Sequence, residues 1–363
     1  MSRHKATLSI LQVIAPHRYS GAERIAIHLA DELRRRGHRV AFACNDHEGF
    51  RQQLAHHDID CLSTAISGKL NPLRLYRLVQ VGRRFGADVI HTHLSSAAWL
   101  GSLAGRLLHV PVLAHVHALN TKTCFVRADM LAACSEGVRR HLLAQGLPED
   151  QVRVIYNGID LARLAGLRPL RDVRADMGIR DGQPVIGVAA HLTPKKGQRH
   201  LIEATALLRD KQPRLLCYLL GEGEQRAKLE SLAAHLGIRQ SVRFMGYRPD
   251  AVDLMQAMDI VVLPSVRKEG LGLCLVEASA LGKAVIGSDA PGIDEVIRNE
   301  RTGLLVPPGN AEALASAVDR LIGDRGLRER MGAAGKQRVR ELFTLEHMAD
   351  KAEQFYYEMI QAR

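Results

Sequence analysis

The sequence is poor in aromatic residues and contains no long apolar run. Only 4% of its 363 residues are Phe, Trp or Tyr, and Trp99 is the single tryptophan. Proteins that bind single-stranded nucleic acid stack bases on aromatic side chains, so this composition argues against that class. No apolar run approaches the ~20 residues that a membrane-spanning helix requires. The short apolar run before Pro16 has no small-residue cleavage site after it, so it predicts a buried strand rather than a signal peptide.

Several motifs that would define other functions are missing. The six cysteines form no C-x-x-C pair, which argues against a zinc knuckle or a redox motif. Most of them lie in apolar segments such as RLLCYLL, where a buried, reduced thiol is expected, and a reducing cytoplasm fits this use of cysteine. The G-x-G-x-x-G fingerprint of dinucleotide-binding dehydrogenases is absent after the first expected strand, and G-E-G-E-Q-R at 221–226 keeps only its first two glycines.

Positive charge is concentrated in the first part of the chain. The formal net charge is +11, and residues 1–155 hold 20 of the 50 Lys and Arg but only 12 of the 39 Asp and Glu. Such a basic half-molecule favours an anionic partner, such as a lipid surface, a phosphorylated acceptor or nucleic acid. The alternative is an arginine-rich solvated surface that has no partner.

Apolar segments rich in Val, Ile and Leu alternate with amphipathic segments twice along the chain, which is typical of parallel sheets covered by helices. The first series predicts strands at 7–15, 39–44, 87–91, 111–116, 129–133 and 152–155, and helices at 22–36, 48–56, 71–84, 95–107 and 136–145. The second predicts strands at 184–189, 214–219, 241–244, 259–263, 283–287 and 303–306, and helices at 197–209, 223–235, 249–257, 272–281, 310–322, 326–342 and 345–361.

The two series predict an α/β protein with two facing Rossmann-like, doubly wound domains and a central cleft. The first domain is expected to span 1–156, and the second 184–343. Residues 157–183 are turn-rich, basic and without a strand, so they predict a linker. Residues 344–363 are expected to form a C-terminal helix that crosses back to the first domain. Ligands of such sheets bind at the carboxyl ends of the strands.

The second domain contains two glutamates eight residues apart, Glu269 and Glu277. A helical segment of this length would separate them by ~12 Å, whereas the paired carboxylates of a glycosidase lie ~5–9.5 Å apart. The spacing therefore suits two ends of an extended ligand, such as the sugar and the ribose of a nucleotide sugar. Gly270 and Gly272 allow backbone to approach a phosphate closely, and a helix N-terminus offers amides to an anion. Alternatively, Glu269 caps the helix and Glu277 is solvated.

A cationic turn precedes another helix of the second domain. Lys195, Lys196 and Gly197 follow the end of an expected strand, an arrangement that can cradle a diphosphate, although a surface lysine pair would look the same. In the first domain, Gly21 lies in the loop after the first strand, and Glu23 falls in the first helical turn, where a carboxylate is favoured.

Two histidine pairs lie at the carboxyl ends of expected strands: His91 with His93, and His115 with His117. Residues i and i+2 share one face of a strand, so a zinc site is conceivable. No carboxylate or cysteine lies at matching spacing, however, and we expect no metal. Contact with a sugar hydroxyl or a leaving phosphate is the favoured interpretation, and we assign His91 and His93 to acceptor binding.

Taken together, these segments resemble the family-four retaining glycosyltransferases, which have the GT-B fold. The resemblance covers nearly the whole chain. Its motifs in the first domain are SGAER, DVIHTHLSSAA, VLAHVHAL, ACSEGVRRHL and VIYNGID. In the second domain they are AHLTPKKG, LLGEGEQRAKLE, the long segment VRFMGYRPDAVDLMQAMDIVVLPSVRKEGLGLCLVEASALGKAVIGSDAPGIDEVI and TGLLVPPGN, and the E-x7-E pair is the most specific of all.

The resemblance implies an acceptor-binding first domain and a second domain that binds a nucleotide-sugar donor. By match, Gly21 offers backbone to the donor diphosphate, and Lys196 holds that diphosphate with Lys195 beside it. Gly270 and the amides of Leu271 and Gly272 face phosphate. His117 lies near the donor sugar, Glu269 binds hydroxyls of the transferred sugar, and Glu277 holds the ribose. Two positions depart from the family: His191 replaces its usual arginine, and Pro291-Gly292 replaces its Gly-Gly ahead of Glu295.

The resemblance also implies a mechanism and a pathway. The acceptor attacks on the front face with retention, no cofactor is involved, and the absence of a D-x-D motif predicts that no metal is needed. We expect hexosyl transfer to a glycan or lipid-linked acceptor in lipopolysaccharide or other bacterial surface polysaccharide synthesis, by a cytoplasmic protein peripheral to the inner membrane. Four arginines on one expected helix support docking on anionic lipid: Arg74, Arg77, Arg83 and Arg84. The alternatives are a nucleotide-sugar epimerase or hydrolase and a basic nucleic-acid-binding protein.

Overall fold

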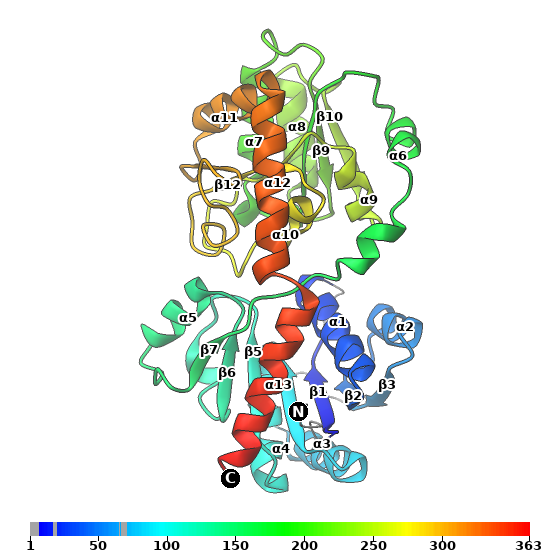
Figure 1. The fold of residues 1–363 in the computed structure, drawn as a ribbon, viewed down its shortest axis with the longest axis vertical. Coiled ribbons are helices and arrows are strands. Elements are labelled where there is room, and N and C mark those ends of the chain that lie inside the picture. The colour runs from blue at the N-terminus through cyan, green and yellow to red at the C-terminus, as the bar shows by residue number, and fades with distance from the viewer. Residues whose placement is uncertain (1–6, 17–19, 65, 67–70) are drawn as a thin grey trace, which may run out of the picture. The chain divides into compact units, whose positions relative to one another are not determined.

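The computed structural model describes residues 7–16, 20–64, 66 and 71–363 (Figure 1). The chain divides into two compact units: residues 1–159 with 344–363, and residues 160–343. Among the described residues, no helix is both long and apolar enough to cross a membrane.

The first unit contains a seven-stranded parallel sheet in the order β3-β2-β1-β4-β5-β6-β7. Its strands are β1 (Ser9–Ile14), β2 (Arg39–Cys44), β3 (Asp60–Ser63), β4 (Val89–His93), β5 (Val112–Val116), β6 (Met130–Ala133) and β7 (Val152–Val154). Its helices are α1 (Gly21–Arg35), α2 (Glu48–His56), α3 (Pro72–Phe85), α4 (Ser95–Leu108), α5 (Glu136–Leu143) and α13 (Leu345–Gln361). Strands β1, β4 and β5 are buried at every position, as expected for a sheet covered on both faces.

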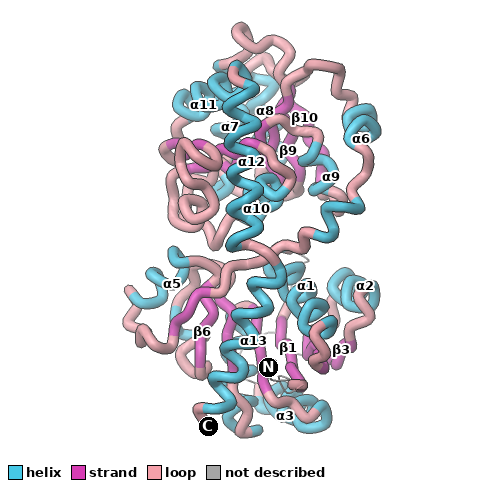
Figure 2. The backbone as a smooth tube through the Cα atoms, viewed as in Figure 1, coloured by secondary structure: helices cyan, strands magenta, loops and turns pink. Residues whose placement is uncertain are grey.

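The second unit contains a six-stranded parallel sheet in the order β10-β9-β8-β11-β12-β13. Its strands are β8 (Val185–Ala189), β9 (Leu216–Leu220), β10 (Val242–Gly246), β11 (Ile260–Leu263), β12 (Ala284–Ser288) and β13 (Leu304–Val306). Its helices are α6 (Leu170–Asp176), α7 (Gln198–Leu207), α8 (Arg226–His235), α9 (Ala251–Gln256), α10 (Leu273–Ala280), α11 (Ala311–Gly323) and α12 (Arg325–Leu342). In each unit the strands gather between helices (Figure 2), which confirms the predicted pair of Rossmann-like domains.

Two local features differ from the sequence-based expectations. Strand β3 was not predicted because its residues, DCLS, are exposed or half-buried at the sheet edge and form no apolar run. The predicted linker 157–183 contains α6 and a short 3-10 turn, Ala162–Gly166. Its Val173 is buried, and the carbonyl of Met177 accepts a hydrogen bond from the Tyr218 hydroxyl. Residues 160–183 of the predicted linker therefore belong to the second unit, which spans Asp160–Phe343.

Helix α13 belongs to the first unit although it ends the chain. Its Asp350 pairs at 2.6 Å with Arg36, the residue that follows α1, and its Glu353 lies 3.2 Å from Nε2 of His38. The start of the helix is fixed by the backbone, since the Leu345 N–H donates to the carbonyl of Ile159 at 2.9 Å. A Cβ on Gly158 would lie only 2.2 Å from the Thr344 carbonyl oxygen, so glycine is required at this close approach.

Candidate active site

The loops at the carboxyl ends of β8 and β11 are tied together in the second unit. Lys195 and Lys196 lie in a 3-10 turn (Pro194–Lys196) after β8, and the Val266 N–H donates to the Lys195 carbonyl at 2.9 Å. Gly197 closes this turn with φ +67°, and a Cβ there would lie 2.0 Å from the Pro264 carbonyl oxygen. Because an L side chain fits neither the backbone angle nor the space, this glycine fixes the turn that presents the two lysines.

Glu269 is the centre of a charged cluster in these loops. Its carboxylate lies 2.9 Å from the Lys196 ammonium and 3.3 Å from that of Lys195, and it accepts a 2.6 Å hydrogen bond from the Ser265 hydroxyl. Only 5% of the residue is exposed. Burial acts to raise the pKa of Glu269, but the two lysines and Ser265 outweigh it and hold that pKa below its ordinary value. The carboxylate is therefore ionised at neutral pH, and Ser265 is a site residue that sequence reasoning missed.

Pro291 and Gly292 support the backbone of Glu269. The Glu269 N–H donates to the Pro291 carbonyl at 3.0 Å. Gly292 has φ +89°, and a Cβ on it would lie 2.5 Å from the Glu269 carbonyl oxygen. The backbones of Gly292 and Glu269 therefore approach each other closely at the second position of the family's Gly-Gly pair, where this chain keeps its glycine.

Helix α10 begins directly after the glycine turn that follows Glu269. Gly272 is its N-cap, with φ +79°, and Leu271 is buried. The first amides of a helix lack intrahelical acceptors, so the N-terminus of α10 can bind an anion. Glu277 lies further along α10 and is only 8% exposed, so the alternative of a solvated residue is wrong. Since the helix starts at Leu273, the ~12 Å helical estimate does not apply to the segment from Glu269.

His191 follows β8 and is half-buried. Its carbonyl accepts a 2.8 Å hydrogen bond from the amide of Gln198, a residue that is itself 1% exposed. The backbone of His191 is therefore held to the start of α7, next in sequence to the lysine turn.

Gly21 is the first residue of α1 in the first unit, so its amide lies at a helix N-terminus. The helix is capped by Ser20, whose hydroxyl donates to the Glu23 carboxylate at 2.6 Å and whose N–H donates to it at 3.1 Å. Glu23 is 3% exposed and serves as the reciprocal half of a capping box.

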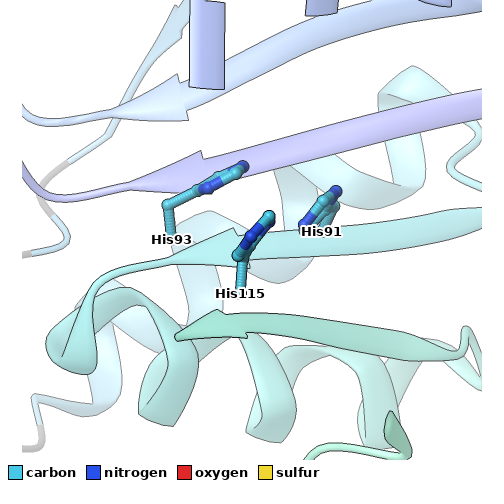
Figure 3. Close-up of side chains that lie close together, drawn as sticks. All are labelled: His91, His93 and His115. Carbon is cyan, nitrogen blue, oxygen red and sulfur yellow. The ribbon is translucent and has the colours of Figure 1, made fainter. Parts of the chain in front are cut away.

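Four histidines cluster on β4, on β5 and directly after β5. Neighbouring rings of His91, His93, His115 and His117 lie 4.3 to 5.5 Å apart between centroids (Figure 3 shows the first three). Nδ1 of His93 lies 2.9 Å from Nε2 of His117, and Nε2 of His93 lies 2.7 Å from Oε1 of Gln12 on β1. Nδ1 of His91 lies 2.6 Å from the Tyr356 hydroxyl on α13.

Burial keeps this histidine cluster uncharged. Desolvation is the main cause that lowers the pKa of each ring, and for His91, His93 and His115 the neighbouring histidines lower it further. The pKa of His117 falls to about 4, although Asn157 acts to raise it. His91 and His93 are 0% exposed, so the predicted direct contact with an acceptor does not fit their position.

Three of these histidines have the proximity of metal ligands. One ring nitrogen each of His91, His93 and His115 lies within 4.8 Å of the others, and neutral imidazole is a common ligand. Both nitrogens of His93 are, however, already hydrogen-bonded, and Nδ1 of His91 is paired with Tyr356. A metal would have to break the His93 contacts, so the arrangement fits a hydrogen-bonded cluster better than a metal centre.

Comparison with known proteins agrees with this architecture. The family model "Glycosyl transferases group 1" matches residues 171–338, and "Glycosyltransferase Family 4" matches residues 19–163. The putative glycosyltransferase EpsD of Bacillus subtilis is 30% identical over 81% of this chain and 76% of its own length. The lipopolysaccharide core biosynthesis glycosyltransferase LpsE of Rhizobium meliloti is 27% identical over 91% of this chain and 94% of its own.

Solved structures share the fold at lower identity. A glycosyltransferase from Rickettsia africae superposes with a TM-score of 0.89 at 24% identity, covering 99% of this chain and 100% of its own. Anabaena Alr3699/HepE in complex with UDP and glucose superposes with a TM-score of 0.87 at 24% identity, covering 97% of this chain and 100% of its own. With two matched family models, a relative at 30% identity and two Rossmann-like domains, the chain belongs to the family-4 glycosyltransferases and has the GT-B fold.

Proposed function

We propose that this protein is a retaining glycosyltransferase that moves a hexosyl group from a nucleotide-sugar donor to a hydroxyl of a glycan or lipid-linked acceptor. The observation that carries the proposal is the buried Glu269 carboxylate held by Lys195 and Lys196 in the loop that leads into α10. Two cations, a helix N-terminus and a carboxylate are the groups that a diphosphate and a sugar require. Complexes of HepE with UDP and with UDP-glucose support this donor class.

The donor roles that we propose are those that the family resemblance implies, and the chemistry of each group supports them. The lysines and the amides of Leu271 and Gly272 bind the diphosphate, assisted by Gly270 and His191, and Gly21 adds backbone from the first domain. Glu269 accepts hydrogen bonds from sugar hydroxyls, and buried Glu277 does so from the ribose. A carboxylate held between lysines is oriented before substrate arrives, which is the preorganisation that catalysis by positioning needs.

The proposed step is a front-face displacement. The acceptor oxygen forms a bond to the anomeric carbon while the bond from that carbon to the diphosphate oxygen breaks. The acceptor proton passes to the leaving diphosphate, whose negative charge the lysines and helix amides stabilise. His117 is uncharged and lies beside the sugar as a hydrogen-bonding group. The positive charge and the hydrogen-bond donors that stabilise the leaving diphosphate are all supplied by the chain's own lysines and amides. We therefore propose neither a cofactor nor a metal ion.

For the pathway, we propose lipopolysaccharide or other bacterial surface polysaccharide synthesis at the cytoplasmic face of the inner membrane. The relative LpsE supports it by name. On α3, Leu73 and Tyr76 are 53% and 60% exposed, and Arg77 and Arg83 are exposed beside them. Such a mixed apolar and basic face suits an anionic lipid surface, because each basic residue near that surface contributes about 1 kcal/mol to binding.

A transfer assay tests the function. Nucleotide sugars are screened first for thermal stabilisation, because a true donor stabilises the native state. The protein and the stabilising donor are then incubated with glycans and lipid-linked glycans extracted from bacterial cells. We expect an acceptor-dependent product with the donor's anomeric configuration, unchanged by a chelator. Turnover without acceptor would instead indicate the epimerase or hydrolase alternative.

Membrane docking is tested separately by sedimentation with phosphatidylglycerol vesicles. We expect binding at low salt that is lost at high salt, because screening shortens the electrostatic range, and weaker binding by Arg77→Glu and Arg83→Glu. A protein that ignores the vesicles at low salt would refute docking.

A further inference from the structure

A cavity of about 680 Å³ lies at the amino ends of four neighbouring strands in the second unit. The four strands are β9, β8, β11 and β12, which are adjacent in this order in the sheet. Residues that lead into them line the cavity: Pro184, Arg214, Asp259 and Lys283. The Glu269 cluster follows the carboxyl ends of β8 and β11, so the cavity lies at the opposite edge of the same sheet and is a separate site.

More basic than acidic side chains line this cavity. The basic residues are Arg174, Arg214, Lys283, Arg325 and Arg328, and the acidic residues are Asp259 and Glu329. Glu329 pairs with Arg325 at 2.7 Å. Asp259 is held by the Val185 N–H, which donates to its Oδ2 at 2.8 Å. Among the residues that the structure describes, no carboxylate lies within ion-pair distance of the other four basic side chains, so direct contact neutralises none of their charges.

Backbone carbonyls fix the position of two of these arginines. The Arg174 guanidinium donates to the Ala257 carbonyl at 3.1 Å, and the Arg328 guanidinium donates to the Ile322 carbonyl at 2.7 Å. Basic residues often bind the last carbonyls of helices, and this role explains why the two arginines lie here. A carbonyl has no net charge, however, so each guanidinium is oriented while its positive charge remains available to an anion.

Lys283 has no such role in holding a helix end. It is half-buried, and its ammonium group makes neither a hydrogen bond nor an ion pair with any residue that the structure describes. Desolvation is the main cause that lowers the pKa of Lys283, Asp259 acts to raise it, and the charge of Arg174 lowers it further. A desolvated charge is costly unless it is paired, and an anion in the cavity would supply the missing partner.

We propose that this cavity binds a multiply charged, non-nucleotide phosphate, held by Lys283 and the arginines around it. Phosphate suits these groups, because guanidinium groups donate paired hydrogen bonds to its oxygens and lysine adds a point charge. The volume lies within the ~300–1,000 Å³ of small-molecule sites, so a molecule larger than one phosphate ion fits. None of the lining residues, all of which the structure describes, is aromatic, which argues against a stacked nucleotide base.

Acylation of lysines in the full-length protein, read by mass spectrometry, tests the site. A bound phosphate covers the Lys283 amine and favours its unreactive ammonium form, so we expect pyrophosphate to slow the acylation of Lys283. Lys351 is exposed on α13 and does not line the cavity, so its rate should not change. Protection of Lys283 that sodium chloride of equal ionic strength reproduces would overturn the inference. Protection of Lys196 without Lys283 would also overturn it, because the anion would then bind only the lysine turn.

Two arginine variants measure the contribution of charge with Lys283 as the reporter. Arg214 is exposed and donates to the Asp181 carbonyl, so Arg214→Gln should fold, as thermal unfolding can check. We expect it to raise the pyrophosphate concentration that half-protects Lys283 by about 2- to 12-fold, the effect of one lost hydrogen bond. Arg209→Gln is the matched control, because Arg209 is exposed in the same loop but does not line the cavity.

An unchanged midpoint in Arg214→Gln, or an equal shift in Arg209→Gln, would refute the site. A hexose bisphosphate that protects Lys283 at lower concentration than pyrophosphate would assign the cavity to a sugar phosphate, and the reverse order would assign it to a polyphosphate. None of these measurements requires sugar transfer, so they decide the inference independently of the proposed function.

Discussion

Glu269→Gln removes one negative charge from the lysine cluster while it keeps the shape of the side chain. The amide oxygen can still accept from the Ser265 hydroxyl, now 2.6 Å from the carboxylate. Lys196 and Lys195, at 2.9 and 3.3 Å, lose their ionic partner. The variant therefore isolates the charge of Glu269 from its packing.

The expected cost in stability follows from how deeply the lysines are buried. Removing one partner of a buried ion pair costs ~3–5 kcal/mol when the other charge stays buried. The side chains of Lys195 and Lys196 are 39% and 23% exposed, so water can solvate both, and we expect about 1–2 kcal/mol. In a domain of 150–250 residues, 1 kcal/mol lowers the Tm by about 2–4 °C, which predicts a fall of about 2–8 °C.

The contribution of Glu269 to stability should also depend on pH. The pKa of Glu269 is lower in the folded protein than its ordinary value, so ionised Glu269 stabilises the fold at neutral pH. That stabilisation is lost as the pH falls from about 4.3, the ordinary value for glutamate, through the lower folded value. The difference in stability between wild type and Glu269→Gln should therefore shrink in this acidic range.

Activity should respond differently from nucleotide binding. A hydrogen bond to a charged group is worth ~1.5–3 kcal/mol, so loss of the carboxylate should lower kcat by about 10- to 150-fold. UDP affinity should stay constant or rise, because the two lysines are released from Glu269. Calorimetry with UDP, thermal unfolding and steady-state kinetics supply the three measurements.

Glu203→Gln is the matched control. Glu203 lies on α7, outside the Glu269 cluster, and its carboxylate pairs with Arg199 at 2.7 Å. It should leave kcat near the wild-type value. UDP affinity that fell in parallel with kcat in Glu269→Gln would refute the separation of sugar and phosphate roles.

Three further predictions concern other positions. Glu277→Ala should raise the donor KM several-fold through lost ribose hydrogen bonds with a smaller change in kcat, and wild-type-like steady-state kinetics would contradict the assignment. His191→Arg should keep or increase kcat, because arginine donates charge-assisted hydrogen bonds to a leaving diphosphate, and a loss of a hundredfold or more would show another role. Cys61 lies 3.3 Å from Cys44 between the sulfur atoms, and the hydrogen bond from Cys44 lowers the pKa of Cys61 to about 7. Iodoacetamide should therefore alkylate Cys61 with a midpoint near pH 7 and far faster than Cys44, and a midpoint at or above 8.5, the ordinary value for cysteine, would exclude the interaction.

The alternation of apolar and amphipathic segments was sufficient to predict both domains. Strands buried on both faces are continuous apolar runs, and helices of ten or more residues separate them, so local sequence carries the βαβ pattern. The sequence also predicted that Lys196, Glu269 and Gly272 lie in turns next to helix starts, because glycine and lysine turns carry a local signal. Strand β3 could not be predicted in this way, because a strand at the edge of a sheet can be partly exposed and needs no apolar run.

Contacts between distant residues were decided only by tertiary structure. Sequence spacing paired His91 with His93, but not His93 with Gln12, 81 residues away, nor His91 with Tyr356, 265 residues away. It likewise assigned His91 and His93 to an acceptor, because exposure cannot be read from a strand whose two faces are both covered. Hydrogen-bond partners, burial and the resulting protonation depend on which strands become neighbours in the sheet, and only the folded chain sets that order.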